Sequence, residues 1–181
     1  MEYWWLGLDP HYVDYAELKQ RGTVAQGWPL LGDLSALVPL AGRAAYRAEF
    51  DRLITDAFWR PGKAAWLKTL RRPKDRDRSL DDQLARAQSA LWHYLQLQPG
   101  DVVVALEGMR AVGLCRVTGG YWYDPDHHYG QCFGHDAVWH DWSECGLPAL
   151  SHVPSRLLAA KRIGAARSQV KAAWLAVSTQ E

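Results

Sequence analysis

Histidine and cysteine residues gather between residues 127 and 145. Four of them could supply the nitrogen and sulfur ligands of a tetrahedral zinc ion. The paired Cys-x2-Cys spacing of strong zinc motifs is missing, so histidines scattered through a loop are the simpler interpretation, and we expect no metal or other cofactor. The four zinc candidates are Cys132, His135, His140 and Cys145.

A hydrolytic site is the second kind of chemistry that this region could support. His127 and His128 stand close to Asp124 and Asp126, and such a set could hold a metal ion for hydrolysis. No lysine lies nearby, and the sequence shows no Ser/His/Asp or phosphate-loop pattern. We therefore expect a binding module and not an enzyme.

The aromatic composition points to stacking as a third kind of chemistry. Ten Trp and eight Tyr accompany only three Phe. A plain core would use Phe freely, whereas Trp and Tyr join a flat face to a polar group and suit stacking surfaces and pockets. Because Trp is well buried on average, we still expect many tryptophans in the core. The expected core members are Trp4, Trp59, Trp66, Trp92, Trp139 and Trp174.

A net charge of +1 conceals two basic segments. Residues 60–78 carry eight basic and two acidic residues, a net +6, and residues 146–180 carry five basic residues and no acidic one. These segments could bind phosphate groups, or they could be solvated helix faces and a loop. The candidate phosphate ligands are Arg71, Arg72, Lys74, Arg76, Lys161, Arg162 and Arg167.

The elements that must position these residues are short strands and helices. Alternating and β-branched runs predict strands, and helical spacing predicts a short helix at 14–20 and a helical insertion over about residues 43–97. The glycine-rich segment 119–134 predicts an aromatic loop, and a helical segment split by Gly164 is expected after residue 154. The predicted strands cover residues 3–8, 23–28, 101–106, 111–117 and 135–142.

Strands near both ends with helices inserted between them indicate an α+β fold built on a small barrel. A length of 181 residues fits a single domain over residues 1–181, and three cysteines argue against a disulfide scaffold. No apolar run approaches the roughly 18 residues of a membrane span. The first residues also lack the layout of a signal peptide. We therefore expect a cytoplasmic location and no membrane partner.

Three segments, in this order, resemble one family of domains. The first is VAQGWPLLGDLS at residues 24–35, and the second is QPGDVVV at residues 98–104. The third begins with AVGLCRV at residues 111–117, continues with GYWY at residues 120–123 and ends with Val138 and Trp139. Together they resemble the PUA-like N-terminal domains of modification-dependent restriction systems of the McrBC and Mrr kind. They are also similar, more distantly, to EVE and YTH domains.

The resemblance spans nearly the whole chain and implies a small PUA-like, EVE/YTH-type β-barrel with flanking helices. Such a barrel holds one base, flipped out of a nucleic acid, in a cage of aromatic side chains. By position, Trp28 matches the first cage wall, and the aromatic loop supplies further walls. Asp33 would contact the polar edge of the base, with Asp9 as a second candidate. The implied pocket residues are Trp28, Asp33, Tyr121, Trp122, Tyr123 and Asp9.

All of these pocket residues except Asp9 also have a structural interpretation. Trp28 could plug the end of the barrel, the loop aromatics could pack on its surface, and Asp33 could cap the helix that follows. If the chain is extended at these aromatics, Tyr121 and Tyr123 should share a face opposite Trp122.

The partner implied by the resemblance is nucleic acid, with DNA carrying a methylated or otherwise modified base favoured by the restriction context. A fused or associated nuclease or NTPase would then act where this module binds. The alternatives are an RNA-binding or protein-interaction module without modified-base specificity, or a zinc-binding domain.

Overall fold

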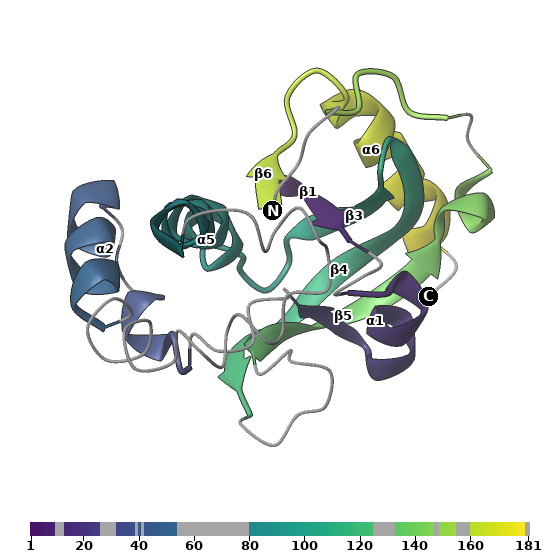
Figure 1. Cartoon of the computed structure of the whole chain (residues 1–181). Coiled ribbons are helices and arrows are strands. Elements are labelled where there is room, and N and C mark those ends of the chain that lie inside the picture. Colours follow the sequence, from purple (N-terminus) through teal and green to yellow (C-terminus); the bar gives the residue numbers. More distant parts are fainter. Residues whose placement is uncertain are drawn as a thin grey trace.

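Six strands form one curled, half-barrel sheet in the computed structural model (Figure 1). The structure describes residues 1–9, 13–25, 32–38, 40, 42–53, 80–124, 133–146, 149–154 and 160–179. Within the sheet the strand order is β2-β5-β4-β3-β1-β6, with β1 and β3 parallel and all other neighbours antiparallel. The strands are β1 (Tyr3–Leu8), β2 (Thr23–Ala25), β3 (Val102–Glu107), β4 (Arg110–Tyr123), β5 (Phe133–Asp141) and β6 (Ala160–Arg162).

Helices cover both faces of this sheet, which gives the α+β architecture expected from the sequence. The short helix predicted at 14–20 is confirmed, and Asp14 caps it by accepting a hydrogen bond from the Ala16 N–H at 2.9 Å. None of the described helices is both long and apolar enough to cross a membrane. The helices are α1 (Tyr15–Arg21), α2 (Arg43–Phe50), α5 (Leu80–Tyr94) and α6 (Arg167–Ser178), with the 3-10 turns η1 (Ser35–Leu37) and η4 (Trp142–Cys145).

Two hydrophobic clusters explain why the central strands are apolar along their whole length. On β1, Trp4 and Leu6 belong to the first core cluster, and Tyr3 and Trp5 belong to the second. The same alternation runs through β3, so all of residues 102–106 are buried, as expected for strands that are covered on both sides. Helices α2 and α5 contribute to the first core cluster, and α6 contributes to the second.

The tryptophans expected in the core are placed there wherever the structure describes them. Trp4, Trp139 and Trp174 are buried, and Trp92 packs, partly buried, against the first core cluster. Trp59 and Trp66 lie outside the described residues.

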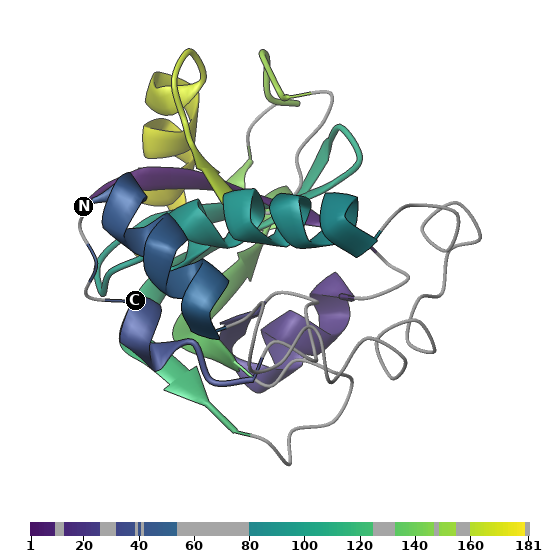
Figure 2. The ribbon, with the colours of Figure 1, turned by 60° about the vertical axis from the view of Figure 1, so that its left-hand side comes forward.

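Helix α5 joins the two edge strands of the curled sheet. The Tyr94 hydroxyl at its end donates a hydrogen bond of 2.8 Å to the Val24 carbonyl on β2, and the helix also contacts β6 at the opposite edge. Figure 2 shows α5 crossing in front of the sheet beside α2.

The motif QPGDVVV forms the anchor between β1 and β3. The carboxylate of Asp101 accepts hydrogen bonds from the Glu2 N–H at 2.8 Å, the Trp4 indole at 2.9 Å and the Gln98 N–H at 3.2 Å. Gly100 before it has a φ of 92°, which lies in the region that favours glycine. The motif therefore has a structural role, because it ties the start of β1 to the start of β3.

Two predictions about secondary structure are confirmed only in part. The predicted loop at 119–134 begins too early and ends too late, because β4 continues to Tyr123 and β5 starts at Phe133. A register shift between Val117 and Tyr121 accommodates the glycines that suggested a loop. The helical segment expected after residue 154 is confirmed only beyond Gly164, where α6 covers Arg167–Ser178. Before Gly164, Ala160–Arg162 forms a strand that pairs with Trp4–Leu6 along the open side of β1.

The predicted strands at 3–8, 101–106 and 135–142 are confirmed to within two residues, and the strand at 111–117 is confirmed but begins at Arg110 and continues to Tyr123. The strand at 3–8 has the predicted ends, and those at 101–106 and 135–142 shift by one or two residues. The strand at 23–28 is confirmed at Thr23–Ala25, and its remainder lies outside the described residues. Within the predicted insertion at 43–97 the structure describes α2 and α5.

Candidate functional site

The predicted aromatic residues lie at the end of β4. Tyr121 stands opposite His135 on β5, and Trp122 stands opposite Gly134. Because side chains alternate along a strand, Tyr121 and Trp122 point to opposite faces. Tyr121 packs against the first core cluster, and the Trp122 ring lies over Gly134, where a β-carbon would overlap it.

Asp33 and Tyr121 meet although 88 residues separate them in the sequence. The Tyr121 hydroxyl accepts a hydrogen bond of 2.8 Å from the Leu34 N–H and lies 3.4 Å from the Asp33 carboxylate, to which it can donate its proton. Burial raises the pKa of Tyr121 above its ordinary value, so the hydroxyl stays protonated at neutral pH. The structure therefore brings two of the predicted pocket residues together.

Asp33 also has the structural role that was weighed against base contact. Its carboxylate accepts hydrogen bonds from the Ser35 N–H at 2.9 Å and the Ser35 hydroxyl at 3.0 Å, which closes the turn into η1. Asp33 is nevertheless exposed. One acidic group thus holds the turn and faces solvent beside Tyr121.

His135 was not predicted to belong to this site, yet its ring lies directly beneath it. The side chain is fully buried, with its ring centroid 5.3 Å from that of Tyr94 and 6.2 Å from that of Tyr121. Burial lowers the pKa of His135 to about 4, so the ring is neutral at pH 7. The carbonyls of Tyr94 and Gly119 offset this only in part, since neither makes a well-formed hydrogen bond with the ring nitrogens.

The remaining pocket candidates are placed differently. Asp9 directly follows Leu8, the last residue of β1, which is in register with Glu107 beside the start of β4. Tyr121 lies near the other end of β4, so Asp9 and Tyr121 are near opposite ends of that strand. Tyr123 is the last residue of β4 and is exposed. Trp28 lies outside the described residues, three positions beyond the end of β2.

The described phosphate candidates lie at the β6 edge, and β2 forms the opposite edge of the sheet. Lys161 and Arg162 belong to β6, and Arg167 begins α6. The guanidinium of Arg167 lies 5.2 Å from the Tyr3 ring and 3.2 Å from a carboxylate oxygen of Glu2. The other four candidates, Arg71, Arg72, Lys74 and Arg76, lie outside the described residues.

The zinc candidates are divided between the two sides of the sheet. His135 contacts rings of the first core cluster, and Cys145 is buried in the second. Cys132 is not described. In the parts of the chain that the structure describes, no three His, Cys, Asp or Glu side chains are close enough together to hold a metal ion.

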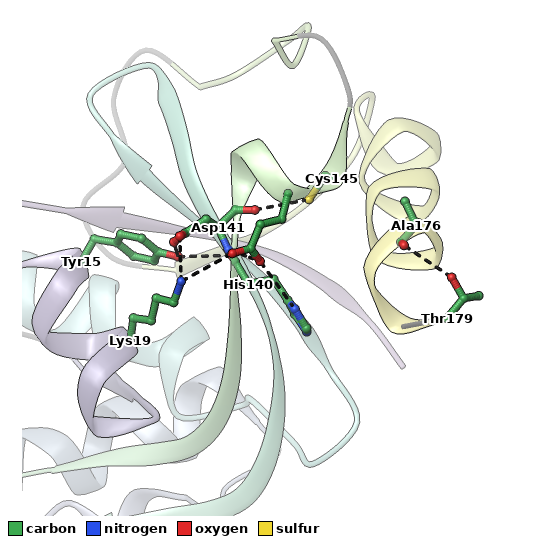
Figure 3. Close-up of polar contacts among 8 residues, drawn as sticks. Tyr15, Lys19, His140, Asp141, Cys145, Ala176 and Thr179 are labelled. Atoms are coloured by element: carbon green, nitrogen blue, oxygen red, sulfur yellow. Dashed lines mark hydrogen bonds and ion pairs between the residues drawn. The ribbon is translucent and has the colours of Figure 1, made fainter. Parts of the chain in front are cut away.

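A polar network that the sequence did not reveal fixes α1 to the sheet (Figure 3). The Tyr15 hydroxyl donates to Asp141 at 2.8 Å, and the Lys19 ammonium lies 2.7 Å from the same carboxylate. Lys19 and Tyr15 together lower the pKa of Asp141, so this carboxylate is ionised at neutral pH. The network borders a cavity of about 510 Å³ between the β3–β4 turn and η4.

Gly113 allows the Tyr15 ring to reach this network, because any β-carbon at residue 113 would overlap the ring. We expect Gly113→Ala to displace the ring and lower the free energy of unfolding by about 1–3 kcal/mol, as overpacking does elsewhere. Gly120→Ala is the matched control, since a β-carbon at residue 120 of the same strand meets open space. Urea unfolding of both variants tests this, and equal midpoints would show that the Tyr15 ring moves at no cost.

The comparisons with known proteins found no match. It matches no family model, no curated protein and no solved structure. The functional argument therefore depends on this chain's own residues.

Proposed function

We propose that this chain is a PUA-like, EVE/YTH-type module that binds a nucleic acid and recognises one modified base. The base would be flipped out of its strand into a pocket where β2 and β4 end. The contact between Asp33 and Tyr121 is the observation that supports this most, because it joins two segments of the resemblance at one place. Neither residue is predicted to do chemistry, so the module would bind and not catalyse.

Stacking on aromatic rings could offset the free-energy cost of flipping a base into such a pocket. Flipping a base costs a few kcal/mol, and an aromatic ring returns roughly 1–3 kcal/mol per stacked base. Two walls could therefore offset most of the cost. In this proposal Trp28 supplies one wall, and an aromatic residue from the end of β4 supplies the other. Of these, Tyr123 is exposed, and Tyr121 is partly buried.

Asp33 suggests which bases fit. A carboxylate can only accept hydrogen bonds, so it favours a base edge that carries an exocyclic amino group. Cytosine, adenine and guanine all carry such a group, and the marks 5-methylcytosine, 5-hydroxymethylcytosine and 6-methyladenine lie on the first two. We therefore propose a modified cytosine or adenine, with the added methyl or hydroxymethyl group against an apolar wall. DNA is the proposed partner, and an associated nuclease or NTPase would act on the marked strand.

Trp28→Ala tests the pocket. We expect the variant to lose about 1–3 kcal/mol of binding to a strand with a modified base, or about 5- to 150-fold in Kd. Circular dichroism would check that it folds. Trp28→Phe should keep most of the affinity because it keeps a flat ring, whereas Trp28→Leu should lose it. If Phe and Leu at this position bind equally well, residue 28 packs in the core and does not stack on the base.

A further inference from the structure

We propose that Arg43, His93, Lys161 and Arg162 form one phosphate-binding surface along the β6 edge, which holds the sugar-phosphate backbone of the bound strand. The inference rests on the proposed function only in naming nucleic acid as the anion. Arg43 and His93 were not recognised from the sequence, because they lie in the helical insertion, far from residues 161–162 along the chain.

Three separate elements, α2, α5 and β6, carry these side chains along the β6 edge. Helix α5 lies between α2 and β6 and contacts both (Figure 1). His93 sits in the last turn of α5, with its ring centroid 6.4 Å from that of Trp4. The Arg162 guanidinium lies 5.3 Å from the same Trp4 ring. Arg43 is the first residue of α2, the helix that contacts α5, and its charge acts on the His93 ring.

The pairing of β6 sets the two strand cations on opposite faces of the edge. Arg162 is in register with Trp4, and Lys161 is in register with Trp5. Trp4 belongs to the first core cluster and Trp5 to the second, so the two basic side chains point to different sides of the sheet. Both are exposed. A backbone that runs along this edge could contact cations on either side of it.

These cations differ from most other basic residues of the described chain. Lys19, Arg21, Arg52, Arg110 and Arg167 each lie within ion-pair distance of a carboxylate. Among the described residues, no carboxylate forms an ion pair with Arg43, Lys161 or Arg162. Neighbouring like charges repel, and a bound polyanion would relieve that repulsion.

The pKa of His93 responds to the charges of these cations. Burial lowers its pKa most, and Arg43, Arg162 and Lys161 lower it further. A phosphate bound among these cations would offset their charge, so the pKa of His93 should rise when an anion binds. The N-terminus of α2 also favours an anion, because Gly42 at its start provides no capping side chain.

A salt titration with an unmodified single-stranded DNA oligonucleotide tests the surface. Each phosphate contact adds about 0.7 to the slope of log affinity against log salt for single strands. The double variant Arg43→Gln with Lys161→Gln should therefore lower the slope by about 1.4. It should also weaken binding in low salt while leaving the fold intact. The matched control is Arg52→Gln with Arg110→Gln, which removes the same charge from cations already paired with carboxylates, and its slope should not change.

A second readout is the pKa of His93, followed by NMR with and without the same oligonucleotide. We expect it to rise in the wild type and to rise less in the double variant. An unchanged salt slope together with an unchanged His93 pKa overturns the proposal. A double variant that self-associates but binds DNA normally also overturns the proposal. The cations would then serve only to keep the edge strand from pairing with other chains.

The two proposals can fail separately. If the surface responds as expected but modified and unmodified strands bind equally, the base-reading function is wrong and the phosphate surface stands. If the modified strand is preferred but the double variant keeps the wild-type slope, the surface is wrong and base reading stands.

Discussion

Replacing Asp101 with alanine is expected to lower the free energy of unfolding by about 3 kcal/mol or more. The change leaves three donors without their acceptor: the Trp4 indole and the backbone N–H groups of Glu2 and Gln98. The buried Trp4 indole costs about 1–3 kcal/mol when it is left unsatisfied, and the two part-buried N–H groups each add a smaller cost. Asp101 itself is 5% exposed, so water cannot easily replace it. Urea unfolding measures the loss.

Asp136→Ala is the control for this variant, because it removes an exposed carboxylate from β5. We expect that change to stay within about 0.5 kcal/mol of the wild type. A loss below about 1 kcal/mol for Asp101→Ala would mean that the three donors find other acceptors. The anchor between β1 and β3 would then not depend on this carboxylate.

Acid is expected to destabilise the protein through His135. The pKa of this buried ring is lowered to about 4, whereas an unfolded histidine titrates near 6.5. Below pH 6.5 the unfolded chain therefore binds a proton that the folded chain does not, so stability falls as the pH falls from about 6.5 towards 4. These two values predict a loss of about 2 kcal/mol at pH 5 relative to pH 7.5.

His135→Phe should remove most of this pH dependence, since the ring between Tyr94 and Tyr121 would remain but no longer titrate. The lowered pKa of His93 adds a further contribution of the same sign. His152→Gln, at an exposed position, should keep the wild-type dependence. Unfolding midpoints at several pH values decide the matter, and a His135→Phe profile that parallels the wild type would contradict this account.

Local patterns predicted the central strands well because both of their faces are buried. Residues 102–106 form a continuous apolar, β-branched run that few other structures accept. Patterns failed where pairing between distant segments decides the structure. Ala160–Arg162 has no alternating signal and becomes a strand only by pairing with β1. Gly119 and Gly120 suggested a loop, but a register shift absorbs them within β4.

In the candidate site, too, the sequence predicts the local features and misses the contacts between distant segments. The aromatic residues at 121–123 were found by type and by resemblance. Their alternation over two faces of β4 was predicted only on the condition that the chain is extended there. The contact of Tyr121 with Asp33 bridges 88 residues, and the sequence gives no local sign of it. His135 was considered only as a zinc ligand, because burial and ring contacts are properties of the folded chain.

The most direct test of the central claim compares the Kd values for two DNA strands that differ in a single base modification. The panel should include 5-methylcytosine, 5-hydroxymethylcytosine and 6-methyladenine, each beside its unmodified counterpart and in an RNA version. The account predicts that one modified strand binds at least about tenfold more tightly than its counterpart, a difference of about 1.4 kcal/mol. Equal Kd values across every pair would contradict it.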